Sequence, residues 1–485
     1  MNNLNFLVDV LKESPVFKTL EKNVKPGRTV CASGLSTINK SNIIYALCRL
    51  KGVTAFCLAS DEKEAQTLCN DLSCMGLRAY VYPVRDFNFL DFQSRSHEYE
   101  HARLKVLLKL INHECDVAIA CVDAAAQLTV PRNVLEQSVI EFEEGRELSL
   151  EKATKALTLL GYERFDAVEG SGQFSLRGGI LDFFMPDSDY PVRCEFWGDE
   201  ITDLSYFDIE TQRRFKKADK ITLSPSTEIV IEDRAALADK IEHKAKLLRS
   251  KNSAKAKEKL FSEAELIRSG AMIANADKFI NQIYDKPESL FDYLDRNTLV
   301  FASEFTAIQE RGKSMDFISN ETLMQGFEDG TLCRGFDRFA LTFNECTEFL
   351  QSHGTIVLEN FVHGSMPIKL SEIISFSTKQ LSAWGGSYKQ LKEDVDGLFT
   401  PESKGVIFAG TERAAKNLCD TFNADGINAV YSEGADKISK GELLVMQGAL
   451  SAGFEYPSQK FFAITYSQVS YRPEKSKKKK KKTGQ

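Results

Sequence analysis

The sequence predicts an α/β protein whose largest unit is a doubly wound parallel sheet of the P-loop helicase-like type. Short apolar runs alternate with amphipathic helical patterns, a segment resembling a phosphate loop joins the first run to the first helix, and 43% of the 485 residues are hydrophobic. Short buried strands separated by helices are typical of parallel sheets covered on both faces. A chain of this length is expected to form about three domains of ordinary size.

The first unit follows from the alternation of strand and helix patterns. The apolar runs expected to form its strands are 29–32, 53–59, 79–82 and 116–122. Helical patterns occupy 41–50, 62–75 and a longer stretch that begins near Glu98 and reaches Ile111. Residues 234–269, rich in Ala, Lys, Glu and Leu, predict further helices that are solvated on one side.

The pattern changes near Gly161. Polar and apolar side chains alternate along 173–177 and 192–197, and Gly198-Asp199 separates the second of these runs from the next. Such alternation indicates β-hairpins with one solvent-exposed face. We therefore expect a small inserted α/β domain over 127–210, flanked by the two segments of the helicase-like domain, 1–126 and 211–345.

A third, smaller α/β unit is expected over 350–470. Its predicted strands are 355–358, 405–408, 443–446 and 461–464, and its predicted helix is 412–422. The remaining residues, 471–485, contain a run of six lysines and predict a basic, disordered linker or tail.

Composition and charge narrow the class of function. The formal net charge is −7. Because the C-terminal tail is basic, the residues before it carry a net charge of about −14, which argues against a protein that coats nucleic acid. Eleven scattered cysteines without a C-x-x-C pair indicate reduced thiols in a cytoplasmic protein. No run suggests a membrane span or a secretion signal.

A damaged phosphate loop spans Gly34 to Ser41. It matches G-x-x-x-x-G-K-S except that Asn39 stands where the second glycine belongs. That glycine lets backbone amides curl around a phosphate, and Lys40 and Ser41 would contact phosphate and magnesium. Because asparagine tolerates left-handed backbone angles, the loop could still form in part.

The partners of a phosphate loop are also damaged. The strand 298–304 has the shape of a Walker B strand, but Ser303 replaces the metal-binding aspartate, and Asp123, after another strand, is more simply a helix N-cap. No Q-x-x-G-R-x-x-R cluster supplies an arginine for a transferred phosphate. We expect no ATP hydrolysis, no catalytic residue and no bound cofactor, while residual nucleotide binding stays open.

The segment His97 to His101 matches H-E-x-x-H, in which two imidazoles one helical turn apart bind zinc. The match is short, its flanks are polar, and no third ligand follows closely. We expect solvated helix residues here and no metal site.

Four motifs carry a family resemblance. They are Gly161 to Arg164, Gly172 to Asp182, Tyr190 to Ile201 and Phe207 to Arg213. On these motifs the chain resembles the N-terminal, UvrB-like module of the bacterial transcription-repair coupling factors (Mfd), with weaker likeness over nearly the whole chain. UvrB itself would need an intact glycine-rich loop and a long Tyr-rich hairpin, for which the roughly twenty residues after Pro83 leave no room.

The resemblance implies a scaffold that recruits UvrA of nucleotide excision repair to RNA polymerase stalled at DNA lesions. The matching UvrA-binding positions are Arg164, Phe174, Arg177 and Phe183; alternatively, the phenylalanines belong to the insert's core and the arginines pair internally. In the family, polymerase is contacted and ATP with magnesium is used by parts that follow the basic linker. DNA contact by this chain would then be weak or indirect.

Two other classes stay open. One is a UvrB- or helicase-like protein with residual ATP and DNA binding through Lys40 and Ser41. The other is a nucleic-acid binder that works through its lysine run, since consecutive lysines attract any polyanion at low salt.

Overall fold

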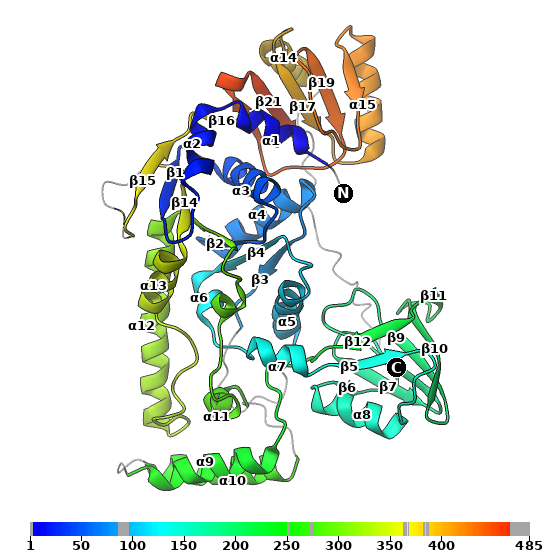
Figure 1. The fold of residues 1–485 in the computed structure, drawn as a ribbon, viewed down its shortest axis with the longest axis vertical. Coiled ribbons are helices and arrows are strands. Elements are labelled where there is room, and N and C mark those ends of the chain that lie inside the picture. Colours follow the sequence, from blue (N-terminus) through cyan, green and yellow to red (C-terminus); the bar gives the residue numbers. More distant parts are fainter. Residues whose placement is uncertain are drawn as a thin grey trace, which may run out of the picture.

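The computed structural model describes residues 3–85, 97–249, 253–270, 276–361, 366, 368–381, 384 and 388–465. A central parallel sheet carries the inserted domain at its side and the third unit at its end (Figure 1). The predicted basic tail, 471–485, lies outside the described residues.

The central sheet contains seven parallel strands in the order β15-β1-β14-β13-β2-β4-β3. Their bounds are β1 Val30–Ser33, β2 Ala55–Ala59, β3 Ala79–Tyr82, β4 Val117–Cys121, β13 Leu299–Ser303, β14 Thr355–Glu359 and β15 Glu372–Ser375. Val30 and Ala32 enter one apolar cluster while Cys31 enters another, so helices bury both faces. The predicted doubly wound α/β class is confirmed.

The helices of this unit follow the strands that they cover. They are α3 Thr37–Lys51, α4 Glu62–Cys74, α5 Glu98–Ile111, α6 Val122–Ala126, α12 Phe305–Asp329 and α13 Phe343–His353. The unit also contains α9 Arg234–Leu247, α10 Ser253–Arg268, α11 Ile280–Ile283 and the 3-10 turns η1 Ala276–Phe279 and η2 Leu290–Tyr293.

The structure differs from the predicted start of the third unit. The strand expected at 355–358 is β14, which lies inside the central sheet, where Ile356 is in register with Val30 on one side and Phe301 on the other. All five residues of β14 are buried, so the strand needs a neighbour on each edge. Apolar periodicity identifies such a strand but not the sheet that it joins.

The third unit is a mixed sheet in the order β16-β20-β21-β17-β19-β18. Its strands are β16 Lys379–Leu381, β17 Lys404–Phe408, β18 Ala429–Tyr431, β19 Glu442–Met446, β20 Gly453–Tyr456 and β21 Phe461–Thr465. Its helices are α14 Tyr388–Leu398, α15 Glu412–Ala424 and the 3-10 turn η3 Pro457–Gln459.

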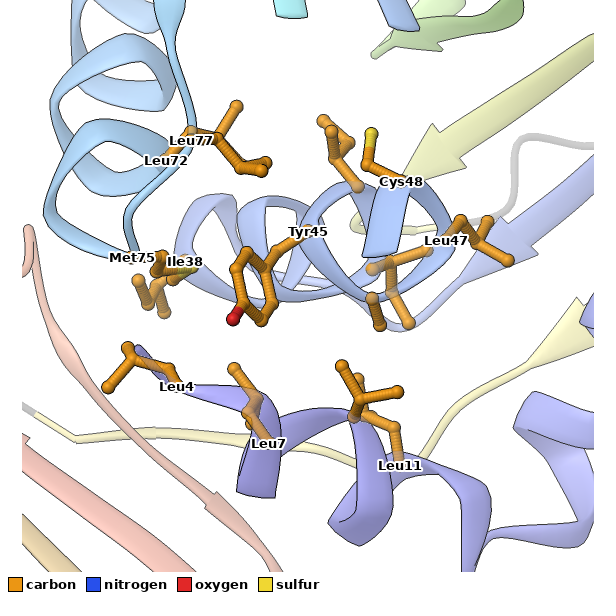
Figure 2. Packing of buried hydrophobic residues seen from close by; sticks show 14 of the residues in the cluster. Leu4, Leu7, Leu11, Ile38, Tyr45, Leu47, Cys48, Leu72, Met75 and Leu77 are labelled. Carbon is orange, nitrogen blue, oxygen red and sulfur yellow. The ribbon is translucent and has the colours of Figure 1, made fainter. Parts of the chain in front are cut away.

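The first and third units share one apolar core. Helix α1, Asn5–Lys12, runs between them, followed by α2, Pro15–Asn23. Figure 2 shows Leu7 and Leu11 of α1 below Tyr45 of α3. Met446 and Phe454 of the third unit belong to the same buried cluster. Since burial of such side chains is the main favourable term in folding, the two units are joined by packing rather than by a linker alone.

The insert has its own core and ends later than predicted. It contains β5 Ile140–Glu143, α8 Leu150–Leu159, β6 Glu163–Arg164, β7 Gln173–Arg177, β8 Ile180–Phe183, β9 Val192–Trp197, β10 Glu200–Phe207, β11 Arg214–Lys217 and β12 Lys220–Leu223. The short helix before it, α7 Arg132–Gln137, buries Leu135 in the apolar cluster of the central unit. The predicted boundary at 210 would separate β12 from β5, although Ile221 and Phe142 are paired in register and buried in one cluster. The composition of the sequence does not change where the chain leaves the insert, so the sequence alone could not locate this boundary.

A buried ion cluster fastens the end of the insert to the central unit. Arg103 of α5 donates to Glu228 at 2.6 Å, and Arg85 lies 3.2 Å from Asp277 and 3.6 Å from Glu100. Arg103 and Glu228 are fully buried. Breaking such a pair leaves an uncompensated buried charge, which costs about 3–5 kcal/mol.

All eleven cysteines are free thiols, most of them buried in apolar surroundings. Across the described ranges, no helix combines the length and the apolar character needed to cross a bilayer.

We predict that Tyr456→Phe weakens the contact between the first and third units. The Tyr456 hydroxyl accepts hydrogen bonds from the side-chain amides of Asn39, at 3.3 Å, and Asn42, at 3.0 Å. Its removal leaves buried donors unpaired and should lower the free energy of unfolding by about 1–3 kcal/mol, measured by urea denaturation. Tyr431→Phe is the matched control, because the Tyr431 hydroxyl makes no hydrogen bond within the described chain. Equal effects of the two substitutions would refute the assignment.

Candidate functional site

The backbone amides of the phosphate-loop segment are already bonded. Gly34 N–H donates to the Asn360 carbonyl at 3.2 Å, and Leu35 N–H donates to the Glu359 carbonyl at 3.1 Å. Gly34 has a φ of +79°, and a Cβ at this position would collide with the Phe376 carbonyl oxygen. The chain beyond β15 therefore closes over the loop, and these two donors are not available to a phosphate.

Lys40 is buried and paired within the protein. Its side chain is only 2% exposed, and its ammonium group lies 2.6 Å from a carboxylate oxygen of Glu304, 2.8 Å from Ser303 Oγ and 3.3 Å from Glu64. Ser303, at the position of a metal-binding aspartate, donates to Glu64 at 2.6 Å. Lys40 thus neutralises internal carboxylates, which is the only way such a charge can be buried at tolerable cost.

Asn39 does not form a left-handed turn. Helix α3 already begins at Thr37, four residues before the predicted start, and Asn39 lies in its first turn with an ordinary negative φ. Its side chain accepts from Ser36 Oγ at 2.7 Å and donates to Tyr456. The residue that replaces glycine therefore connects α3 to the third unit.

Ser41 is also occupied by the fold. Its hydroxyl donates to the Thr37 carbonyl at 3.3 Å and approaches Asp71 at 3.4 Å. Asp71 accepts from the backbone and the hydroxyl of Ser451 in the third unit. Burial, partly offset by these hydrogen bonds, raises the pKa of Asp71 to about 6.

Asp123 is not the helix N-cap that the sequence predicted. It lies within the first turn of α6, where Cys121 is the N-cap, and its carboxylate pairs with Arg311 at 2.7 Å. Glu62, Cys121 and Asp123 are the one group of potential metal ligands found among the described residues. The Arg311 guanidinium contacts both Glu62 and Asp123, so a cation already balances this group.

The H-E-x-x-H histidines contribute to packing and hydrogen bonding. His97 Nδ1 lies 2.9 Å from Glu100, and the two imidazole rings stack with centroids 5.9 Å apart. His101 is partly buried against Gly172 of the insert, where any Cβ would meet its ring. The expectation of fully solvated residues is therefore wrong for His101, because the insert covers it.

The four positions taken from the family motif divide into two groups. Arg164 and Arg177 are exposed, whereas Phe174 and Phe183 are 3% and 0% exposed. Phe183 packs on Phe142 with ring centroids 5.0 Å apart. Direct contact of the two phenylalanines with a partner is wrong for this fold; they form the insert's core, as the alternative held.

The two arginines differ in direction and in bonding. Arg164 is in register with Phe174, so both occupy one face of the sheet, while Arg177, three residues along β7, points from the other face. Arg177 donates to Asp182 at 2.8 Å but stays 51% exposed. Arg164 has no hydrogen bond or ion pair within the described part of the chain.

The exposed aromatic at this edge is Phe165, which the sequence analysis missed. It follows Arg164 directly and is 44% exposed, and its backbone N–H donates to the Phe174 carbonyl. Asp182 is buried and joins Arg177 to Arg193 across three strands, in line with the alternative that the arginines pair internally. A lone aspartate inside an apolar strand was the available signal for such a bridge.

Comparisons with known proteins agree with the motif resemblance. Residues 140–229 match the family model described as the UvrB interaction domain. Over 97% of its length, the chain is 26% identical to a transcription-repair-coupling factor of Bacillus subtilis (strain 168). Proteins of that name from Staphylococcus epidermidis (strain RP62A) and Staphylococcus aureus (strain MRSA252) are 25% and 22% identical over 83% and 99% of this chain.

The predicted resemblance to the N-terminal part of these factors is therefore confirmed. The chain spans 41% of the Bacillus subtilis relative, 35% of the Staphylococcus epidermidis relative and 41% of the Staphylococcus aureus relative.

We predict that Glu359→Gln flattens the pH dependence of stability. Glu359 is buried beside Glu304; burial, followed by the charge of Glu304, raises the pKa of Glu359 to about 7. A raised pKa means that protonated Glu359 stabilises the fold at low pH and that this stability is lost as the pH rises from the unfolded pKa toward 7.

Urea unfolding of both proteins between pH 5 and 8 is the measurement. Between pH 5 and pH 8 the free energy of unfolding of the variant should rise by on the order of 2 kcal/mol relative to that of the wild type, because glutamine mimics the protonated carboxyl. Parallel pH profiles would show that Glu359 is not protonated in the folded protein.

Proposed function

We propose that this chain is the N-terminal part of a transcription-repair coupling factor and acts as a scaffold that recruits UvrA to RNA polymerase stalled at DNA lesions. One observation carries the proposal: residues 140–229 match the UvrB interaction domain and fold as a separate unit at the side of the molecule (Figure 1). A UvrB-like surface on a second protein offers UvrA a place to bind.

Scaffolding is favoured over nucleotide turnover by the state of the phosphate loop. Lys40, Ser41 and the amides of Gly34 and Leu35 all bond within the protein. Phosphoryl transfer needs these groups to bind the nucleotide and its magnesium ion. In this proposal ATP with magnesium, translocation and contact with polymerase belong to the part of the relatives that the chain does not span.

The UvrA-binding surface is proposed at the β6 edge of the insert. At this edge Arg164 presents a guanidinium that is unpaired in the described chain, and the next residue, Phe165, presents an exposed aromatic ring; Arg177 adds a second cation from β7, on the sheet face opposite Arg164. Arginine and aromatic side chains dominate binding energy in protein interfaces. Phe174 and Phe183 hold β7 and β8 in position from below. DNA contact by this chain is then indirect, through UvrA and polymerase.

We predict that the double substitution Arg164→Ala, Arg177→Ala weakens UvrA binding about 100-fold or more, because two charge-assisted contacts are lost. Isothermal titration calorimetry with purified UvrA measures the effect, and circular dichroism confirms the fold. Asp182 keeps Arg193 as a partner, so the substitution does not strand a buried charge.

Arg213→Ala is the matched control. Arg213 is an exposed arginine of the same insert, next to β11 at the opposite edge of the sheet. Unchanged binding in the double variant, or an equal loss in the control, would exclude the β6 edge. No binding by the wild-type chain would reject recruitment itself.

A further inference from the structure

A basic cavity opens at the amino ends of the central strands, whereas the phosphate-loop segment lies at their carboxyl ends. It has a volume of about 260 Å³ and is bounded by the segments that lead into β1, β2, β13 and β14. Its cationic lining consists of Lys25, Arg28, Lys51 and Arg296. No acidic side chain lines it among the residues that the structure describes.

These cations are largely unneutralised. Lys25, Lys51 and Arg296 are exposed and have no ion-pair partner in the described ranges. Arg28 donates to Glu372 at 3.2 Å with one terminal nitrogen, while its Nε is buried without a hydrogen-bond partner. A buried donor without a partner is uncommon in folded proteins, and the remaining donors of Arg28 are therefore able to bond to a further partner.

The floor of the cavity is apolar. Val24, Val53 and Ile356 line it, and the His353 ring is held there by Thr298, whose carbonyl oxygen lies 2.9 Å from Nε2. Four cations around an apolar floor complement a ligand with two or more negative charges and an apolar or ring-shaped body. The volume suits a small molecule rather than a folded partner.

We propose that this cavity binds a small phosphate ester, with its phosphate groups at Lys25, Arg28, Lys51 and Arg296 and its body on the apolar floor. The site is separate from the phosphate-loop segment, and the inference does not depend on UvrA recruitment. A free nucleotide and the phosphorylated end of a DNA strand share this chemistry.

Calorimetry at 50 mM and 200 mM salt tests the proposal with the intact chain. The probes are ADP, inorganic pyrophosphate, and a short oligonucleotide with either a 5′-phosphate or a 5′-hydroxyl. We expect one site per chain, binding that weakens with salt, and at least about a tenfold loss of affinity in the variant Lys51→Gln, Arg296→Gln.

Lys18→Gln, Lys63→Gln is the matched control, because it removes two exposed lysines that do not line the cavity. Tighter binding of the 5′-phosphate oligonucleotide than of ADP would identify the ligand as a DNA strand end. Tighter binding of ADP would identify it as a free nucleotide. Absence of binding by all probes, or binding that the cavity variant leaves unchanged, would overturn the proposal.

Acetylation of the wild-type chain gives a second measurement that needs no variant. Bound ADP or pyrophosphate should protect Lys25 and Lys51, but not Lys18 and Lys63, from acetic anhydride, read by mass spectrometry. Equal modification with and without the probes would contradict a site at this edge.

Discussion

The buried ammonium group of Lys40 is the interaction on which the central unit depends. Taking a charge out of water costs several kcal/mol, and only close partners of opposite charge offset that cost. Here Glu64 from α4 and Glu304 after β13 supply the partners, and Ser303 completes the hydrogen bonds. One side chain thereby fastens α3 to α4 and to the carboxyl ends of the strands, where a nucleotide would otherwise lie.

The third unit and the insert extend the same frame. Tyr456 and Ser451 of the third unit bond to polar groups of α3 and α4, while apolar side chains of the first and third units form one core. At the other side, the buried pair of Arg103 and Glu228 fixes the chain where it leaves the insert. Buried charge pairs therefore hold the C-terminal end of the insert against the central unit.

Local sequence signals predicted the elements better than their partners. The parallel sheet, its helices and the hairpins follow from apolar periodicity, and the damaged loop follows from Asn39 and Ser303. Sequence could not place β14 in the central sheet, because its apolar pattern suits either sheet equally. Nor could it show that Lys40 pairs with Glu304, that Phe174 is buried or that Phe165 is exposed, since these depend on contacts between distant segments and on the face each strand presents.

A double-mutant cycle on the free energy of unfolding tests the central claim most directly. Lys40→Met should cost about 3–5 kcal/mol, because it leaves buried carboxylates without their cation. In the presence of Glu304→Gln, the same substitution should cost at least about 1 kcal/mol less, which is the coupling expected of residues in contact. A Lys40→Met protein within about 0.5 kcal/mol of the wild type would show that Lys40 is dispensable to the fold, as expected of a surface position.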